Sequence, residues 1–526
     1  MSETARMTKA AGIVGTATLL SRILGFVRDV IVAWFFGAGM SADAFFVAFR
    51  IPNLLRRLFA EGSLTISFIP VFTEYLSRNG REEAFRLARC ACWLLSIVLT
   101  VVAVAGILLS PLIIHIIAPG FLSSPEKFDL TVILTRIMFP YIFFIGLVAL
   151  CMGILNALGH FAAPALAPVM LNLAMISAVI LFSPHLEKPA LGLAIGVIIG
   201  GILQLGLQVP FLIRRGFRLT IRGPLYHPAI KRIALLMTPA VFGAAVYQIN
   251  VFIGTILASL LPEGSISYLY YADRLVQFPL GVFGIAMATA LLPSLSRLAA
   301  KNDLEGLRIS FAYALKLVFF ITIPAMTGLI VLKEPIVRLL FQRGAFDVAT
   351  TRLTAEALFY YALGLWAFSG VRIVVSTFYA LQDTKTPVKM AVISLLVNVL
   401  LSISLMGPMQ HGGLALATSL AAMTNLILLV LALKKRLGRI GAQDIIGSVL
   451  KSTAAAAVMG SVIGALALWG VPKCAGSTWQ LVVWIFGSIV AGSLLYGVCA
   501  FLFRSRELAA MIDIVRSNPN PRKKRK

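Results

Sequence analysis

Apolar runs long enough to cross a membrane recur along this sequence, and this feature limits its possible folds most strongly. A helical run of about twenty apolar residues spans the ~30 Å hydrocarbon core of a bilayer. Only 13% of the 526 residues are charged, whereas a soluble protein has roughly 25% charged residues to cover its surface. The sequence therefore excludes a soluble enzyme, and also a disordered or fibrous chain. It predicts an all-α polytopic membrane protein.

Hydrophobic periodicity predicts about fourteen transmembrane helices. The second of them contains Pro52 and Gly62, so we expect it to be bent or broken there. The predicted helices cover 10–36, 44–76, 88–117, 130–158, 162–184, 189–214, 230–261, 266–297, 309–333, 353–381, 388–407, 412–435, 446–470 and 480–503.

The chain also repeats itself with an offset of about 223 residues. Segments 48–50, 110–113 and 153–158 match 272–274, 334–337 and 376–381, and the same offset pairs Pro70, Gly120 and Pro164 with Pro293, Gly344 and Pro387. We therefore expect two six-helix lobes related by an axis along the membrane normal, with a substrate site between them. The predicted domains are an N-terminal lobe at 1–222, a C-terminal lobe at 223–440, and a C-terminal helix pair with a basic tail at 441–526.

Basic residues gather in alternate loops, and this pattern predicts the orientation of the chain. There are 46 Lys and Arg against 21 Asp and Glu, a net charge of +25. Because positively charged loops stay in the cytoplasm, we expect both termini to be cytoplasmic. The opposite loops have few basic residues, except around Arg338, Arg343 and Arg352. We interpret the basic run at 522–526 as an anchor on anionic lipid and not as a nucleic-acid site.

Motifs for catalysis and metal binding are not found in the sequence. The five cysteines form no Cys-x-x-Cys pair, the five histidines are scattered, and no Gly-rich nucleotide loop occurs. The sequence therefore predicts a carrier with no metal, no cofactor and no chemical step of its own.

Charged residues interrupt the first predicted helix on one face. At ~100° per residue, one arc of about 120° holds Thr18, Ser21, Arg22, Gly25, Arg28 and Asp29. An Arg or Asp at the centre of a span costs about 2.5 to 3.5 kcal/mol on insertion scales. Snorkelling arginines or a structural Arg22–Asp29 pair would explain this face. Because Ser, Thr and Gly share it, the pattern favours a cationic stripe that faces the protein interior.

The second predicted helix continues this pattern with Asp43, Arg50, Asn53, Arg56, Arg57 and Glu61. An unbroken helix would put Arg57 and not Arg56 on the face of Asp43, but Pro52 makes that projection uncertain. In the second repeat, Asp273 and Arg274 begin a similar face, while the preceding helix has Gln248 and Asn250 and no basic residue. Most of the positive charge is thus predicted in the N-terminal half.

Several guanidinium groups in a low-dielectric space suit one kind of ligand. They bind an anion with several oxygens, above all a phosphate or a diphosphate. An exporter of drugs or metal cations would favour carboxylates and aromatic side chains instead.

Two segments with these residues closely resemble the MurJ (MviN) lipid II flippases. Residues 21–29 read SRILGFVRD and residues 42–62 read ADAFFVAFRIPNLLRRLFAEG. The resemblance continues at 270–279 and 385–389 and extends over essentially the whole chain.

This resemblance implies a member of the multidrug/oligosaccharidyl-lipid/polysaccharide exporter superfamily in the bacterial inner membrane. Such a protein flips lipid II, the undecaprenyl-diphosphate-linked peptidoglycan precursor, to the outer leaflet by alternating access. The resemblance implies that the substrate-binding residues are Arg22, Arg28, Arg56 and Arg274, which favours Arg56 over Arg57. The resemblance also implies that Asp43, Glu61 and Asp273 are functionally sensitive. With the polar residues of the first two predicted helices, the supporting polar and charged residues are Ser21, Asp29, Asp43, Arg50, Asn53, Glu61 and Asp273.

The resemblance also implies a groove for the lipid tail along the last two helices. Lipid II and membrane lipids are the expected partners, with other cell-wall synthesis proteins as further candidates. Some similar proteins bind sodium through the seventh and eleventh helices, where this chain has Asn250 and Asp383. A coupling cation and the membrane potential both stay open as energy sources.

Two other functions fit the same composition. A flippase for another polyprenyl-diphosphate oligosaccharide, such as an O-antigen unit, would need an equally cationic cavity. A cation-coupled drug exporter of the same superfamily is the second alternative, and only the specific motifs favour lipid II over both.

Overall fold

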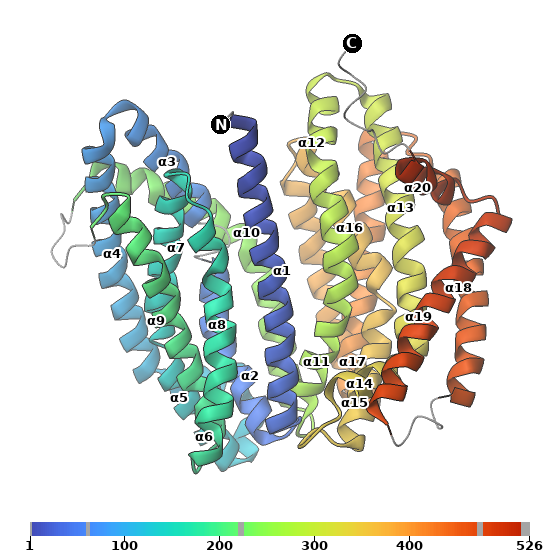
Figure 1. Cartoon of the computed structure of the whole chain (residues 1–526), viewed down its shortest axis with the longest axis horizontal. Coiled ribbons are helices and arrows are strands. Elements are labelled where there is room, and N and C mark those ends of the chain that lie inside the picture. The colour runs from blue at the N-terminus through green and yellow to red at the C-terminus, as the bar shows by residue number, and fades with distance from the viewer. Residues whose placement is uncertain (1–2, 59–63, 219–225, 471–476, 517–526) are drawn as a thin grey trace. The chain divides into compact units, whose positions relative to one another are not determined.

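The structure is a computed structural model, and it describes residues 3–58, 64–218, 226–470 and 477–516 (Figure 1). Every regular element in these ranges is a helix. Among the described residues, nine helices are long and apolar enough to cross a membrane, and one bent pair raises the number to ten. The expected all-α polytopic fold is therefore confirmed, while the larger number of spans stays a prediction.

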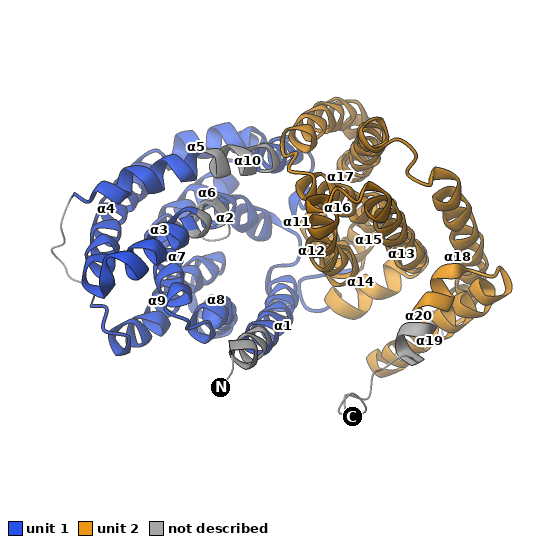
Figure 2. Cartoon of the chain, turned by 90° about the horizontal axis from the view of Figure 1, so that it is seen from above, with its two compact units in different colours: residues 1–267, 343–347 blue, residues 268–342, 348–526 orange. Residues whose placement is uncertain are grey.

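The chain forms two compact units, which Figure 2 shows in separate colours. Unit 1 is residues 1–267 with 343–347, and unit 2 is 268–342 with 348–526. The helices of unit 1 are α1 (Glu3–Phe36), α2 (Met40–Leu58), α3 (Leu64–Arg78), α4 (Gly80–Leu108), α5 (Ser110–Ile117), η2 (Pro119–Ser123), α6 (Pro125–Met138), α7 (Tyr141–Ala157), α8 (Ala162–Leu181), η3 (Ser183–His185), α9 (Ala190–Arg214) and α10 (Pro228–Ser259).

Helix α11 (Ser265–Pro279) begins in unit 1 and continues in unit 2. The other helices of unit 2 are η4 (Leu280–Ile285, a π-helical turn), α12 (Ala286–Ala300), α13 (Leu304–Val331), α14 (Lys333–Phe341), α15 (Val348–Ala362), α16 (Leu365–Ala380), α17 (Lys385–Leu437), α18 (Ala442–Gly470), α19 (Thr478–Leu502) and α20 (Arg506–Arg516). Helix α10 packs within unit 1, although the repeat makes it the first helix of the second half. The domain boundary at residue 222 stays a prediction.

The second predicted span consists of two helices, α2 and α3. Pro52 lies inside α2, whereas the predicted break at Gly62 lies outside the described residues. Its counterpart in the second half is also irregular, because α11 and α12 are joined by the π-helical turn after Pro279. Interrupted helices of this kind are tolerated in a membrane where neighbouring helices satisfy the backbone groups.

Helix α17 is two antiparallel segments and not one span. A straight helix of its 53 residues would be about 80 Å long, more than twice the thickness of the bilayer core. Gln410 has a non-helical backbone, with φ 48° and ψ −129°, and marks the reversal. The Ser394 hydroxyl donates a hydrogen bond of 2.8 Å to the carbonyl oxygen of Ala421, across the two segments. The predicted helices at 388–407 and 412–435 correspond to these segments.

Residues with positive φ follow the spacing of the sequence repeat at three helix ends. The left-handed residues Gly80, Gly159 and Gly216 in the first half match Asn302, Gln382 and Gly438 in the second half. Two arginines also act alike: Arg215 donates to the carbonyl oxygen of Leu158 at 2.8 Å, and Arg436 donates to that of Leu381 at 3.3 Å. Related turns in both halves therefore share a residue with positive φ.

Small residues bring α8 and α9 of unit 1 close together. Gly192, Gly196 and Gly200 recur every four residues on α9, and an added Cβ at each would overlap atoms of Ser183, of Ala178 and Met175, or of Leu171. Such small-xxx-small stripes drive helix association in membranes, where burying apolar surface gains little.

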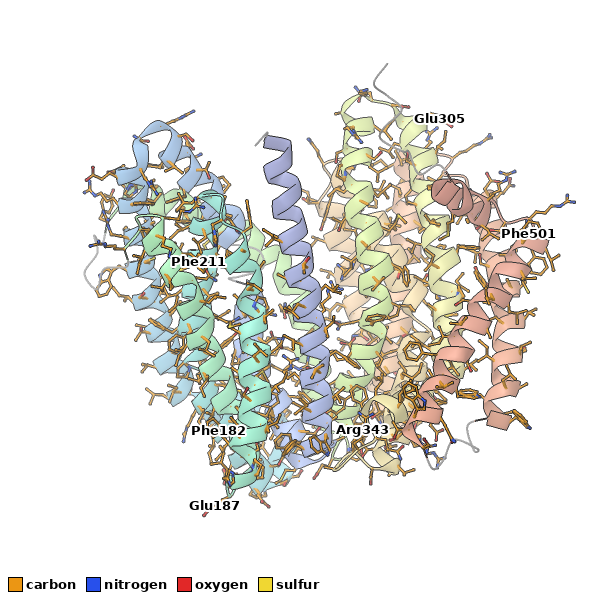
Figure 3. All side chains as sticks on the ribbon, viewed as in Figure 1. Phe182, Glu187, Phe211, Glu305, Arg343 and Phe501 are labelled. Atoms are coloured by element: carbon orange, nitrogen blue, oxygen red, sulfur yellow. The ribbon has the colours of Figure 1, made fainter. Side chains whose placement is uncertain are left out.

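Large apolar side chains remain on the outside of the helices, as Figure 3 illustrates. Phe182 in unit 1 is 41% exposed, and Phe501 at the end of α19 in unit 2 is 71% exposed. Soluble monomers rarely expose such apolar surface. This surface fits contact with lipid.

Candidate functional site

The polar face of α1 is present in unit 1, but its two arginines have different surroundings. Arg22 is exposed, and the described residues provide it with no hydrogen bond or ion pair. Arg28 is half-buried, and Asp29 is 3% exposed. Of the two arginines on this face, Arg22 is thus the more open to a ligand.

Arg28 is held by its neighbour and by α8. Its Nε and Nη2 donate to Asp29 Oδ1 at 3.1 and 2.7 Å, and its Nη1 donates to Asn172 Oδ1 at 3.1 Å. Asn172 also donates from Nδ2 to the carbonyl oxygen of Ser21 at 3.1 Å. The structural ion pair considered for Arg22 and Asp29 is therefore formed by Arg28 and Asp29.

Sequence reasoning missed Asn172, which is buried in the middle of α8. The sequence does contain a signal for this residue, since Asn172 is a single amide among the apolar residues of a predicted span. Polar side chains inside a membrane generally face a partner, so such an amide indicates a polar contact.

The arginine-rich face of α2 is described in part. Arg50 and Arg56 are half-buried, and Arg56 Nε donates to Asn53 Oδ1 at 3.1 Å. The side chain of Arg57 and the whole of Glu61 lie outside the described residues. The choice between Arg56 and Arg57 as a ligand of the substrate stays a prediction.

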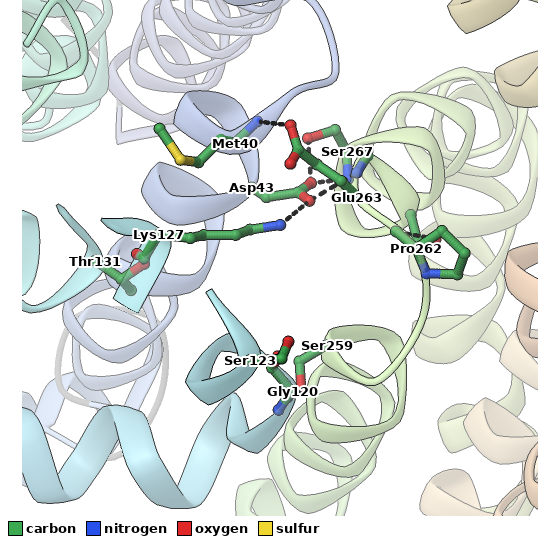
Figure 4. Close-up of polar contacts among 12 residues, drawn as sticks. Met40, Asp43, Gly120, Ser123, Lys127, Thr131, Ser259, Pro262, Glu263 and Ser267 are labelled. Atoms are coloured by element: carbon green, nitrogen blue, oxygen red, sulfur yellow. Dashed lines mark hydrogen bonds and ion pairs between the residues drawn. The ribbon is translucent and has the colours of Figure 1, made fainter. Parts of the chain in front are cut away.

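Asp43 lies at the other end of α2, in the first turn, and is 1% exposed (Figure 4). Its Oδ2 accepts from Lys127 Nζ and from the Gly264 backbone N–H, both at 2.8 Å. Its Oδ1 accepts from the backbone N–H of Ser267 at 3.0 Å and from its hydroxyl at 2.7 Å. Asp43 therefore binds the segment that joins α10 and α11. It lies about 10 Å from Arg50 along α2, at a rise of 1.5 Å per residue.

Lys127 was not predicted as a functional residue. It precedes the predicted span that begins at 130, so no span pattern drew attention to it. Its partner became visible only in three dimensions.

Unit 2 contributes the remaining predicted residues on α11. Arg274 donates from Nη2 to the Tyr270 hydroxyl at 2.8 Å, and its guanidinium carbon lies 4.9 Å from the centre of the Tyr270 ring. Asp273 accepts a hydrogen bond from the Gln277 side chain one turn later. Arg274 belongs to unit 2 and Arg22, Arg28 and Arg56 to unit 1, so their gathering in one cluster stays a prediction.

Metal-binding chemistry gets no support from the described side chains. In the described ranges no three His, Cys, Asp or Glu residues are grouped to hold a metal ion. Cys90, Cys92, Cys151 and Cys499 are free and buried, and Cys474 lies outside the described residues.

Long apolar helices with arginines and carboxylates on single faces define a polytopic membrane transporter, because buried ionisable groups in membranes mark the path of a substrate. The chain belongs to the MurJ family of lipid II flippases, since the family model "Lipid II flippase MurJ" matches residues 32–487.

Relatives and solved structures agree with this assignment. The chain is 40% identical over 481 residues to the "Probable lipid II flippase MurJ" of Vibrio cholerae, covering 90% of each chain. It is 40% identical over 424 residues to the "Lipid II flippase MurJ" of Burkholderia cenocepacia, covering 80% of this chain and 82% of the relative. A structure of "Lipid II flippase MurJ, inward closed conformation" has a TM-score of 0.78 at 29% identity and covers 93% of this chain and 98% of that chain.

The fold is shared more widely. An inward-facing multidrug resistance MATE family transporter of the MOP superfamily has a TM-score of 0.66 at 15% identity, with 82% of this chain and 98% of that chain covered. At this identity the similarity shows the fold alone.

Proposed function

We propose that this protein flips lipid II, the undecaprenyl-diphosphate-linked peptidoglycan precursor, from the cytoplasmic to the outer leaflet of the bacterial inner membrane. The observation that carries this proposal is the family match over residues 32–487. The names of the Vibrio and Burkholderia relatives support the same substrate. The protein is a transporter and performs no chemical step on the precursor.

Arg22, Arg28, Arg56 and Arg274 would bind the diphosphate. The exposed guanidinium of Arg22 supports a first contact with the anion. Arg28 would exchange its bonds to Asp29 for bonds to phosphoryl oxygens, which are equally strong charge-assisted acceptors. This site would be supported by Ser21, Asp29, Arg50, Asn53, Glu61 and Asp273. Asp43, at the start of α2, would instead hold the segment between α10 and α11.

Alternating access between two six-helix lobes would move the headgroup, while the polyprenyl tail stays in lipid along α18 and α19. The lobes and the helix pair would be 1–222, 223–440 and 441–526. One elementary charge that crosses the full field exchanges about 2.3 kcal/mol per 100 mV. A potential that is negative inside would favour outward movement of the anionic headgroup, and the potential or a counter-cation would return the empty, cationic carrier.

Orientation and partners follow from the same proposal. Both termini would be cytoplasmic, which is supported by the basic loops. Other cell-wall synthesis proteins would receive the precursor at the outer leaflet.

The test replaces the arginines one at a time. Arg28→Ala and Arg274→Ala should lower translocation at least about tenfold, because a buried charged partner is worth more than about 1.4 kcal/mol. Arg78→Ala is the matched control, since the Arg78 side chain is 77% exposed and, in the part of the chain that the structure describes, pairs with Glu74 one turn away. The measurement is the amount of precursor that an impermeant reagent reaches on the outer leaflet of cells with equal amounts of each variant.

Normal translocation by both arginine variants would contradict the proposed site. Accumulation of a different polyprenyl-diphosphate sugar on depletion of the protein would indicate the related flippase, and binding of organic cations without the arginines would indicate the drug exporter.

A further inference from the structure

Lys127 is a buried cation at a place where the helix backbone does not favour one. It is 6% exposed and lies in the first turn of α6. Lysine is almost never fully buried unless it is paired. The N-terminus of a helix carries a partial positive charge, so a cation there is unfavourable by itself. A specific partner must therefore compensate for both costs.

That partner is the carboxylate of Asp43. Lys127 Nζ donates to Asp43 Oδ2 at 2.8 Å, and the side chains are 8% and 2% exposed (Figure 4). Lys127 Nζ also lies 4.3 Å from the centre of the Phe121 ring, in η2. The two helices that carry the pair, α2 and α6, pack against each other. Lys127 and Asp43 thus form a buried ion pair within the first half of the chain.

Asp43 in turn caps a helix that begins far away in the sequence. The first N–H groups of a helix have no partner inside it. Asp43 accepts from the backbone of Gly264, just before α11, and from the backbone and hydroxyl of Ser267 in its first turn. We call residues 259–267, from the last residue of α10 to the first turn of α11, the α10–α11 connection. Three of the four hydrogen bonds of Asp43 therefore come from this connection, and the fourth comes from Lys127.

Two further contacts hold the same connection. The Met40 backbone N–H donates to Glu263 Oε1 at 2.6 Å, and that of Gly120 donates to the Ser259 hydroxyl at 3.2 Å. Glu263 is exposed, and Ser259 is uncharged. Of these contacts, the one made by Asp43 alone involves a buried charge.

We propose that Lys127 is a positioning residue for Asp43, which it neutralises and aims at the start of α11. The proposal rests on the proposed function, in which the first sequence repeat, with Asp43 and Lys127, would move relative to the second repeat, which begins with α10. When the α10–α11 connection separates from α2, Asp43 loses three hydrogen bonds. It keeps the one from Lys127, because Lys127 lies on α6, which packs against α2. A carboxylate buried without a partner would cost several kcal/mol. Lys127 thus allows the connection to break and re-form without an isolated buried charge.

The first experiment removes the cation. Lys127→Met should lower translocation at least about tenfold and leave Asp43 without its permanent partner. Lys333→Met is the matched control: Lys333 Nζ lies 4.6 Å from the Phe359 ring, and the described residues give it no ion pair. Lys127→Arg retains the charge and should translocate within about threefold of the unaltered chain.

A second measurement follows the connection itself and needs no substrate. Ile266 is 2% exposed in the first turn of α11. In an Ile266→Cys background, Lys127→Met should lower the rate of modification by an impermeant thiol reagent several-fold, because opening would then leave Asp43 without any partner, whereas Lys333→Met should leave the rate unchanged. Adding Asp43→Asn to Lys127→Met should raise this rate again, because the amide is neutral and opening no longer leaves a buried charge without a partner.

The charge exchange Asp43→Lys with Lys127→Asp separates pairing from capping. The exchanged chain should be present in the membrane at the amount of the unaltered chain, but Ile266→Cys should become reactive, because a lysine at position 43 accepts no hydrogen bond from α11. The proposal is overturned if Lys127→Met behaves like Lys333→Met, or if the exchange restores both translocation and protection. If the unaltered chain translocates no precursor while the modification rates follow this pattern, the proposed substrate is wrong and the role of Lys127 stands.

Discussion

At the scale of single residues, the two arginines on the polar face of α1 have different surroundings. Arg28 is bound by Asp29 and by the amide of Asn172, while Arg22 stays exposed six residues earlier on the same face. The helical projection placed both arginines on one face. It could not rank them, because the partner of Arg28 on α8 lies 144 residues away in the sequence.

The contacts of Asp383 predict how the stability of the fold depends on pH. It lies in the turn between α16 and α17 and accepts from the Thr386 backbone at 3.0 Å, from the Thr386 hydroxyl at 2.8 Å and from Arg436 at 2.6 Å. These bonds, the one from the Thr386 backbone first, hold the pKa of the Asp383 carboxyl below its ordinary value. A lowered pKa stabilises the fold at neutral pH, and this contribution is lost as pH falls below about 4.

Asp383→Asn should therefore lower the free energy of unfolding by at most about 1 kcal/mol at pH 7, since Arg436 is partly exposed. The difference from the unaltered protein should shrink as pH falls below about 4, where the carboxyl also becomes neutral. Thermal unfolding in detergent over a pH series measures it. If the difference in stability between the two proteins stays constant down to pH 3, the negative charge of Asp383 does not contribute to stability.

At the scale of elements, glycines decide how closely helices and turns approach. An added Cβ at Gly120 would overlap the carbonyl oxygen of Ser259 at the end of α10, and one at Gly344 would overlap Trp34 near the end of α1. Ala345 also donates to the Trp34 carbonyl oxygen at 2.9 Å. Gly120 and Gly344 are matched by the sequence repeat, so each half uses a glycine turn against the first helix of the other half.

Replacing one of these glycines has a predictable cost. Gly120→Ala should destabilise the protein by about 1 to 3 kcal/mol, because an overpacked site forces the backbone to move. Gly206→Ala on α9 is the control: an added Cβ there meets no atom within 4 Å, and alanine favours a helix by about 1 kcal/mol. The midpoints of thermal unfolding should thus shift in opposite directions. Equal midpoints would contradict the close approach of Gly120 and Ser259.

At the scale of the whole molecule, the repeat organises the helices. Left-handed residues return at the same spacing in both halves, and α17 folds back on itself at Gln410 as the two last spans of the second repeat. Arg436, at the end of α17, donates to the carbonyl oxygen of Leu381, which precedes its start. Both ends of α17 therefore lie together.

This arrangement predicts the sides of the membrane on which α17 is accessible. In intact cells, an impermeant thiol reagent should modify Gly407→Cys near the reversal. It should modify Arg439→Cys, beyond the basic end of α17, only after the cells are opened, because basic loops stay in the cytoplasm. Both positions are exposed. Modification of both in intact cells would exclude a hairpin that crosses the membrane twice.

The sequence by itself determined the helical membrane fold, the repeat, the polar face of α1 and the family, because hydropathy, periodicity and short motifs are local properties of the chain. The tertiary structure decided which charges are paired. Asp43 and Lys127 were separated by 84 positions and belong to different helices, and Asn172 reaches Arg28 from α8. Hydrogen bonds act only over a few ångströms, so a partner that is distant along the chain becomes known only when packing brings it near.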